Sequence, residues 1–216
     1  MSYIGRTPTP AALTASDITD GIVSNAKLAQ DIISADTALG AAPADTDELL
    51  VSDAGTLKRM DYSYIKAANT PAFQAYLSSN QTITEVVDVK LACDTELYDT
   101  DSAYDNSSNY RFTPQTAGKY MVYACATFTT STDDNMRSVS LMVHKNGSRV
   151  DFFGTSYRNN HIRNAQVYGS VIVDFNGSSD YVEIYSFGNT GDDANPDIVG
   201  GTNDKAFFGA YKLIGV

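Results

Sequence analysis

The sequence is poor in the residues that support redox and metal chemistry. It has no tryptophan, two histidines and two cysteines among 216 residues. Two cysteines cannot form a disulfide framework, and Cys93 and Cys125 are too far apart for a C-x-x-C redox or zinc site. We therefore expect both to be reduced residues that pack in a core, and we predict no metal and no cofactor.

Basic residues are also scarce. Fifteen lysines and arginines stand against 26 aspartates and glutamates, the formal net charge is −11, and the basic residues form no cluster. Such a chain lacks the electrostatic footprint of a protein that binds nucleic acid or an anionic membrane. No apolar run of about 18 residues occurs, and residues 1–15 lack the regions of a signal peptide. We predict no nucleic-acid partner, no membrane insertion and synthesis in a cytoplasm.

Aromatic residues are unevenly distributed along the chain. Of the 23 phenylalanines and tyrosines, three lie in the first 70 residues, at Tyr3, Tyr62 and Tyr64. This part is rich in Ala, Thr, Ser, Asp and Pro and cannot bury a core of its own. We predict an N-terminal segment over residues 1–66, a linker over residues 67–70 and one globular domain over residues 71–216.

The stretch from Tyr110 to Phe128 organises the globular domain, because a turn marked by Pro114 and Gly118 precedes a long alternating strand. Alternate side chains of a strand share a face. One face carries Tyr120, Val122, Ala124, Ala126 and Phe128, and the other carries Met121, Tyr123, Cys125 and Thr127. Both faces are largely apolar, so both must be covered. We predict that an outer layer or a neighbouring chain covers the second face.

From Pro71 onward, short apolar runs separated by Gly, Asn, Asp and Ser indicate an all-β domain. The runs lie at residues 71–76, 82–93, 138–144, 150–153, 164–175, 181–187 and 206–214. Asn146-Gly147 is typical of a tight hairpin turn. We expect the polar residues 94–109 to form a loop anchored by Tyr98 and Tyr104.

Six short motifs follow one another in this domain. They are Pro71-Ala72-Phe73, Tyr110-Arg111-Phe112-Thr113-Pro114, Gly118-Lys119-Tyr120, Lys145-Asn146-Gly147, Asp180-Tyr181-Val182-Glu183-Ile184 and residues 207–214. In this order they resemble the globular head of complement C-one-q and the tumour necrosis factor jelly rolls. The family has Gly-Asp where this chain has Ser179-Asp180, and Phe-Ser-Gly-Phe at residues 207–210.

The resemblance implies a ten-stranded jelly-roll β-sandwich that assembles as a homotrimer through aromatic faces. A trimer would also cover the second apolar face of the long strand. On this basis we predict that five residues lie in the trimer interface: Met121, Tyr123, Cys125, Phe207 and Tyr211.

Two stretches of the N-terminal segment resemble units of bacteriophage fibre and appendage proteins. One covers residues 16–29, with a weak echo at residues 31–34. The other is Asp47-Glu48-Leu49-Leu50-Val51-Ser52-Asp53-Ala54-Gly55-Thr56-Leu57-Lys58-Arg59, which also reads as a small hairpin. The resemblance implies that this segment docks on other virion proteins and starts trimerisation; a flexible tail without a role is the alternative.

Catalytic and metal-binding patterns are weak in this sequence. His144 and His161 could be imagined beside Ser138, Ser156 or Asp151 as a triad, but no strained nucleophile turn is present. The aspartates at residues 99–101 and 192–197 could hold calcium, but they match no twelve-residue calcium loop, so we expect solvated loops. We predict that the protein is not an enzyme.

These observations lead to a functional hypothesis. We predict a trimeric structural protein of a bacteriophage tail fibre, located in the virion and assembled in the host cytoplasm, whose head binds a host-surface glycan or protein. The expected contacts are Tyr157, Arg158, Asn159, Asn160, His161 and Arg163, because exposed aromatic and hydrogen-bonding loop residues commonly carry recognition. A capsid decoration protein and a polysaccharide depolymerase are the alternatives.

Overall fold

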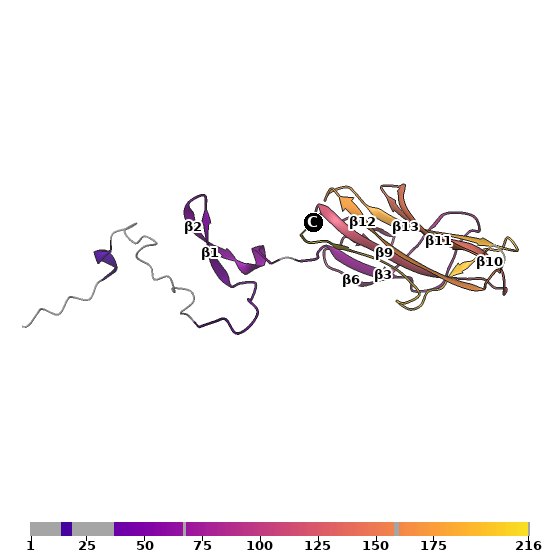
Figure 1. The fold of residues 1–216 in the computed structure, drawn as a ribbon, viewed down its shortest axis with the longest axis horizontal. Helices are drawn as coiled ribbons and strands as arrows, with labels where there is room; N and C mark the ends of the chain where they lie inside the picture. Colours follow the sequence, from indigo (N-terminus) through magenta and orange to yellow (C-terminus); the bar gives the residue numbers. More distant parts are fainter. Residues whose placement is uncertain (1–13, 19–36, 67, 158–159, 216) are drawn as a thin grey trace, which may run out of the picture. The chain divides into compact units, whose positions relative to one another are not determined.

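A computed structural model describes residues 14–18, 37–66, 68–157 and 160–215 of the chain. The chain divides into two units, Met1–Lys66 and Ala67–Val216 (Figure 1). Residues 19–36 carry most of the two phage-like units predicted at residues 16–29 and 31–34, and they lie outside the described residues.

The first unit contains the predicted hairpin. Its described elements are η1 (Ala15–Asp17), β1 (Glu48–Asp53), β2 (Thr56–Asp61) and η3 (Tyr62–Tyr64). Ala54 and Gly55, with φ of 49° and 85°, form the turn that joins β1 to β2. Leu50 and Leu57 are 74% and 69% exposed. An isolated two-stranded hairpin is at best marginally stable in water, so the two strands alone contribute little stability.

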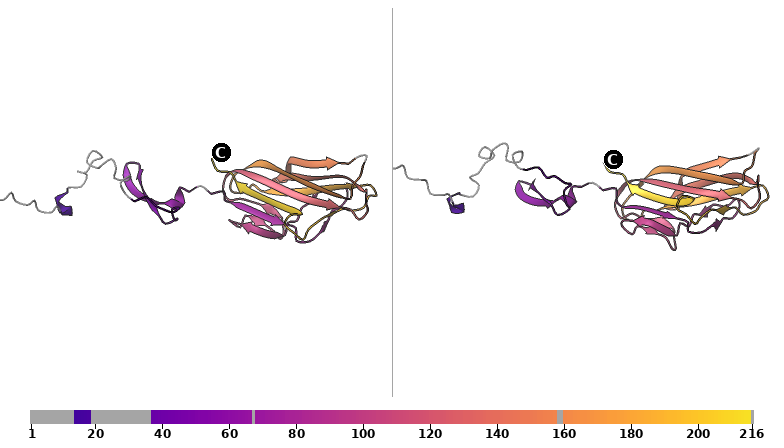
Figure 2. Two further views of the ribbon diagram at one scale, coloured as in Figure 1. Left: turned by 60° about the horizontal axis from the view of Figure 1, so that its bottom comes forward. Right: turned by 90° about the horizontal axis from the view of Figure 1, so that it is seen from below.

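The second unit is an antiparallel β-sandwich, which confirms the all-β prediction. The six-stranded sheet contains β5 (Val89–Lys90), β7 (Tyr104–Asp105), β8 (Arg111–Phe112), β10 (Met136–Lys145), β11 (Ser148–Ser156) and β13 (Val182–Thr190). The seven-stranded sheet contains β3 (Ala72–Tyr76), β4 (Gln81–Thr82), β6 (Thr95–Asp99), β9 (Gly118–Thr129), β12 (Asn164–Phe175), β14 (Asp197–Ile198) and β15 (Ala206–Lys212). The long strands run along the length of the sandwich (Figure 2).

The order of strands explains which residues meet. The six-stranded sheet runs β11-β10-β13-β8-β7, with β5 also paired to β13. The seven-stranded sheet runs β4-β14-β9-β15-β3-β6, with β12 paired to β9. The turn between β10 and β11 contains Asn146 and Gly147 with φ of 51° and 78°, which confirms the predicted hairpin.

An aromatic cluster fills the space between the sheets. The Phe73 ring stacks on Tyr104 at 4.5 Å and on Phe112 at 4.6 Å, and it meets Phe208 edge-on at 4.9 Å. The predicted inward residues of β9 are all fully buried: Tyr120, Val122, Ala124, Ala126 and Phe128. Both cysteines are free and buried, as predicted. None of the helices in the described part of the chain is long and apolar enough to cross a membrane.

Two predictions about local structure were wrong. Residues 94–109 are not a single loop but contain β6 and β7, and Tyr104 is a core residue whose hydroxyl donates to the Cys93 carbonyl at 2.8 Å. The polar composition arises because β6 lies at the edge of its sheet. Residues 82–93 are not one strand, because Val86 takes a positive φ of 58° and separates β4 from β5.

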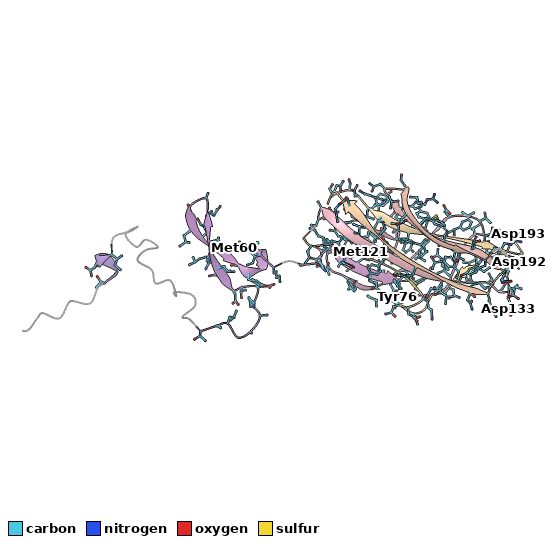
Figure 3. All side chains as sticks on the ribbon, viewed as in Figure 1. Met60, Tyr76, Met121, Asp133, Asp192 and Asp193 are labelled. Atoms are coloured by element: carbon cyan, nitrogen blue, oxygen red, sulfur yellow. The ribbon has the colours of Figure 1, made fainter. Side chains whose placement is uncertain are left out.

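The two ends of the sandwich differ. At the proximal end the last strand meets the start of the domain, where the Lys212 amide donates to the Pro71 carbonyl at 3.2 Å. Asp133, Asp192 and Asp193 gather at the opposite, distal end (Figure 3). The predicted contact loop belongs to the distal end, because Arg163 forms an ion pair with Asp133 at 3.2 Å.

Candidate subunit interface

The outward surface of the seven-stranded sheet carries several exposed and partly exposed rings. We call it the aromatic face and define it by Tyr98, Met121, Tyr123, Tyr168, Ile172, Phe207 and Tyr211, which come from β6, β9, β12 and β15. Tyr168 is 73% exposed and Ile172 is 54% exposed. Exposed patches of large apolar and aromatic side chains commonly mark protein–protein interfaces.

Strand register brings these residues together in three rows. One row joins Tyr168, Cys125, Phe207 and Tyr76, a second joins Ser170, Tyr123, Gly209, Gln74 and Tyr98, and a third joins Ile172, Met121, Tyr211 and Ala72. Side chains directly opposite one another in an antiparallel pair lie about 5 Å apart and contact each other. The rows therefore make one continuous surface from five strands, β12, β9, β15, β3 and β6.

Tyr123 lies at the centre of this surface, and Gly209 makes room for it. A Cβ atom at Gly209 would lie 2.3 Å from Cζ of the Tyr123 ring, so the ring covers a position that no larger residue could share. Phe207 and Tyr211 flank the ring, with centroid separations of 6.2 and 6.3 Å. Gly209 thus acts as a seat for the ring: because it has no side chain, the Tyr123 ring can lie directly against the sheet.

A short hydrogen-bond chain fixes the Tyr123 hydroxyl. The hydroxyl donates to Oε1 of Gln74 at 3.1 Å, and the Tyr98 hydroxyl lies 3.4 Å from the Tyr123 hydroxyl. Burial raises the pKa of Tyr123 above its ordinary value of 10, and the hydrogen bond with Tyr98 raises it further. Tyr123 therefore stays protonated and keeps its donor role at neutral pH.

The centre of the aromatic face is hollow. The hollow measures about 400 Å³, and its walls include Met121, Tyr168, Phe207 and Tyr211. It is open to solvent in a single chain, and its rim is formed by the exposed ring of Tyr168. A hollow of this shape can receive a protruding side chain of another protein, which is how well-packed interfaces anchor their partners.

The structure brings together four of the five residues predicted for the trimer interface. Met121, Tyr123, Phe207 and Tyr211 share the hollow. Cys125 belongs to the same face but is only 4% exposed, because it lies between Tyr168 and Phe207 in its row. Burial raises the pKa of the Cys125 thiol, so this side chain is a packing group and not a reactive thiolate.

The structure describes only part of the predicted host-contact loop, residues 157–163. Arg158 and Asn159 lie outside the described residues. Tyr157 is half-buried and packs against the core, while Asn160 is exposed and Arg163 is held by Asp133. His161 is half-buried near Gly191. The contact role of this loop remains a prediction.

The residues considered for a catalytic triad are not joined by hydrogen bonds in the part of the chain that the structure describes, and Asp192, considered for calcium binding, bonds to a neighbouring side chain. His144 stacks on Tyr185 at 4.4 Å, and among the described residues it makes no hydrogen bond with Ser138, Ser156 or Asp151. Asp192 accepts a hydrogen bond from Asn135 at 2.6 Å. In the described ranges, no three or more His, Cys, Asp or Glu side chains gather as metal ligands would.

Sequence reasoning missed three members of the aromatic face, Tyr98, Tyr168 and Ile172, and it also missed Gln74, which accepts the hydrogen bond of Tyr123. A signal for Tyr168 was present, because the alternation of residues 164–175 puts it on the face opposite the buried Val167. No local signal could identify Gln74 and Tyr98, since their contact with Tyr123 depends on the pairing of β3 with β6 and β15.

No protein-family model matches the chain, and no curated protein matches it. Solved structures do. The Eiger tumour necrosis factor from S. frugiperda has a TM-score of 0.51 at 13% identity, over 67% of this chain and 93% of that one. The globular domain of zebrafish complement 1qA protein has a TM-score of 0.47 at 16% identity, over 67% and 98% of the two chains. Murine APRIL at pH 8.5 has a TM-score of 0.45 at 12% identity, over 66% and 98%. The likeness to the Eiger structure, together with the two antiparallel sheets, identifies the sandwich as a jelly roll of the tumour necrosis factor kind, as predicted.

Proposed function

We propose that the chain is a homotrimeric structural protein of a bacteriophage tail fibre. In this proposal the jelly roll is a head that binds the host surface, and the N-terminal segment docks on other virion proteins. The aromatic face is the observation that carries the trimer. A single chain leaves Tyr168, Ile172 and Tyr98 73%, 54% and 43% exposed on one sheet.

Burial of this surface in a trimer would be favourable. Each fully buried large apolar side chain contributes about 1.5 to 3 kcal/mol. The hollow between Met121, Tyr123 and Phe207 offers a place for a neighbour's side chain. Threefold symmetry lets three identical chains cover three identical faces with no open edge, which is the usual reason for closed oligomers. The resemblance to complement C-one-q and tumour necrosis factor also implies a trimer.

The appendage role is supported by the first unit. Residues 47–59 carry the phage-like module, and they fold as the β1-β2 hairpin with exposed leucines at positions 49, 50 and 57. Such a hairpin gains stability when a partner covers it. Other virion proteins, or the hairpins of the two other chains, would supply that cover.

The oligomeric state is the first test. We expect the full-length chain to have three chain masses by light scattering after size exclusion. Tyr168→Glu should give single chains, because it places a charge at the rim of the hollow. Val150→Glu is the matched control on the other sheet, where Val150 is 47% exposed, and it should remain trimeric. A wild-type monomer, or a trimer that tolerates Tyr168→Glu, would contradict the proposal.

The place of the protein on the particle is the second test. Labelled imaging of virus particles should find the chain on the tail, and purified trimer should adsorb to host cells. The alternative of a capsid decoration protein predicts label on the capsid and particles that lose heat resistance without the chain. The depolymerase alternative predicts release of reducing ends from host polysaccharide, which we do not expect.

A further inference from the structure

A groove crosses the outward surface of the six-stranded sheet, on the opposite side of the sandwich from the aromatic face. Its volume is about 470 Å³, which lies within the range of small-molecule sites. Register places Gly154 beside Ser140 and Phe152 beside Met142 on β11 and β10. Gly154 leaves room for the Phe152 ring, and the small Ser140 side chain keeps the neighbouring part of the floor low. We call this surface the outer groove.

Two phenylalanines form the walls of the outer groove. Phe152 of β11 is 54% exposed, and its ring folds over Gly154, where a Cβ atom would lie 2.7 Å from the ring. Phe187 of β13 stands on the other side, next to Ser140 in the register. An exposed ring on a strand gains free energy when an apolar surface covers it. Both walls therefore favour a ligand with a flat apolar side.

Polar groups without partners line the rest of the groove. Asp88 and Arg149 contribute one charge of each sign, Ser138 and Ser156 contribute accessible hydroxyls, and Ser140, which is 3% exposed, contributes to the floor. Among the residues that the structure describes, none of these five side chains makes a hydrogen bond or an ion pair; Arg149 only approaches the Phe152 ring, at 5.8 Å. Donors and acceptors at such a site are available to a ligand that carries hydroxyls.

We propose that the outer groove binds a neutral hexopyranose chain. A pyranose ring has an apolar C–H side that can cover Phe152, and hydroxyls at its edge that can bond Asp88, Arg149 and the two accessible serine hydroxyls. The charges of Asp88 and Arg149 balance, so the groove does not select a charged sugar, and the chain's net charge of −11 repels polyanionic glycans. This sugar-binding proposal depends on the proposed function in one respect only: the sugar would come from a host surface.

Trimer formation leaves this site open. The aromatic face lies on the seven-stranded sheet, whereas the outer groove lies on the six-stranded sheet, so each chain of the trimer can present its own groove. Three equivalent weak sites on one particle appendage bind a repeating polysaccharide more tightly than one site, since the second and third contacts become intramolecular.

The test uses the full-length chain and neutral tetrasaccharides of glucose, mannose and galactose. We expect at least one to give saturation-transfer signals on its ring protons at about 10 mM, where a site with a Kd of about 1 mM is nearly full. Phe152→Ala should weaken that binding about tenfold, which corresponds to the loss of one covered ring. Arg149→Ala, an exposed change that spares the fold, should also weaken it. Val150→Ala, on the same strand outside the groove, should bind like wild type.

Three results would overturn the proposal: no neutral tetrasaccharide binds, binding survives both Phe152→Ala and Arg149→Ala, or an acidic tetrasaccharide or a peptide binds in preference. The two proposals fail separately. If the protein is a monomer that binds sugar through Phe152, the proposed trimeric appendage is wrong and the sugar site is supported. If it is a trimer that binds no neutral sugar, the sugar site is wrong and the proposed trimer is supported.

Discussion

The two outward faces of the sandwich are built by the same alternation of side chains, yet they differ in what they present. On the aromatic face the Tyr123 ring lies over Gly209, is flanked by Phe207 and Tyr211, and lines the central hollow. On the other face the Phe152 ring lies over Gly154, next to the small side chain of Ser140. Both faces thus have a glycine beneath a ring, but the first surrounds that ring with further aromatic side chains and the second surrounds it with serines and charged groups.

The faces also differ in how they hold charge. Glu183 on the outward side of β13 is 5% exposed and pairs with Lys90 at 2.5 Å. Lys90 donates in addition to the Asn109 carbonyl at 2.9 Å. The aromatic face has neutral hydrogen bonds from Tyr123 instead. The groove face thus depends on a covered ion pair, and the aromatic face depends on ring packing.

Removal of Glu183 should give the largest effect. Glu183→Ala leaves the Lys90 charge without its partner, and we expect a loss of about 3 kcal/mol in the free energy of unfolding, the cost typical of a broken buried pair. Asp174→Ala is the control, because it breaks the exposed Lys119–Asp174 pair and should cost less than about 1 kcal/mol. Denaturant unfolding measures both. Equal losses would mean that burial does not distinguish the two pairs.

Gly209→Ala should give an intermediate effect, confined to the aromatic face. The new methyl group forces the end of the Tyr123 ring to move and breaks its bond to Gln74, at a cost of about 1 to 2 kcal/mol. We expect a weaker trimer by light scattering and an intact jelly roll by circular dichroism.

A double-mutant cycle sharpens this test. In a Tyr123→Ala background the ring is absent, so Gly209→Ala should cost almost nothing further. A cost that persists without the ring would mean that the strand itself, and not the seat for the ring, requires glycine at position 209.

The smallest expected effect is a pH dependence on the groove face. Burial lowers the pKa of His144 below its ordinary value of 6.5 and Arg149 lowers it further, against the opposing carboxylates of Asp88 and Glu183. The unfolded chain therefore binds a proton first as the pH falls. The contribution of neutral His144 to the free energy of unfolding is therefore fully present above pH 6.5, and it is lost as the pH falls toward the lower pKa of the folded state.

His144→Asn should flatten this decline. The measurement is the midpoint of urea unfolding between pH 5 and 8, for wild type and variant. His144 stacks on Tyr185, and its Nε2 atom is buried without a partner in the described part of the chain. If wild type and variant have the same slope, burial of His144 is not its cause.

The sequence was sufficient to predict the elements with strong local patterns. The alternation of residues 120–128 identified the inward side of β9, and Asn146-Gly147 identified the turn into β11. Edge strands were not predictable in this way, because β6 has one neighbouring strand and solvent elsewhere, so its composition is polar. Tyr104 is similar, because it lies on the two-residue strand β7 at the end of its sheet, where polar neighbours in the sequence hide its place in the core.

The surfaces were less predictable than the strands. Met121 and Tyr123 followed from alternation, but the row that joins Tyr123 to Gly209 and Gln74 depends on the pairing of strands far apart in sequence. The outer groove depends on the alignment of Gly154 with Ser140 across a hairpin that contains a bulge. Register of this kind is set by the whole sheet, so no single segment reveals it.

The meeting of β3 and β15 at the proximal end has a practical consequence. Since Lys212 bonds to Pro71, the domain's first and last strands leave the sandwich at one place. A tag or cargo peptide joined after the last residue would emerge there, far from the loops that carry Asp133, Asp192 and Asp193 (Figure 3). Those loops could then be randomised to select new binding specificities, and the jelly roll would serve as a display scaffold.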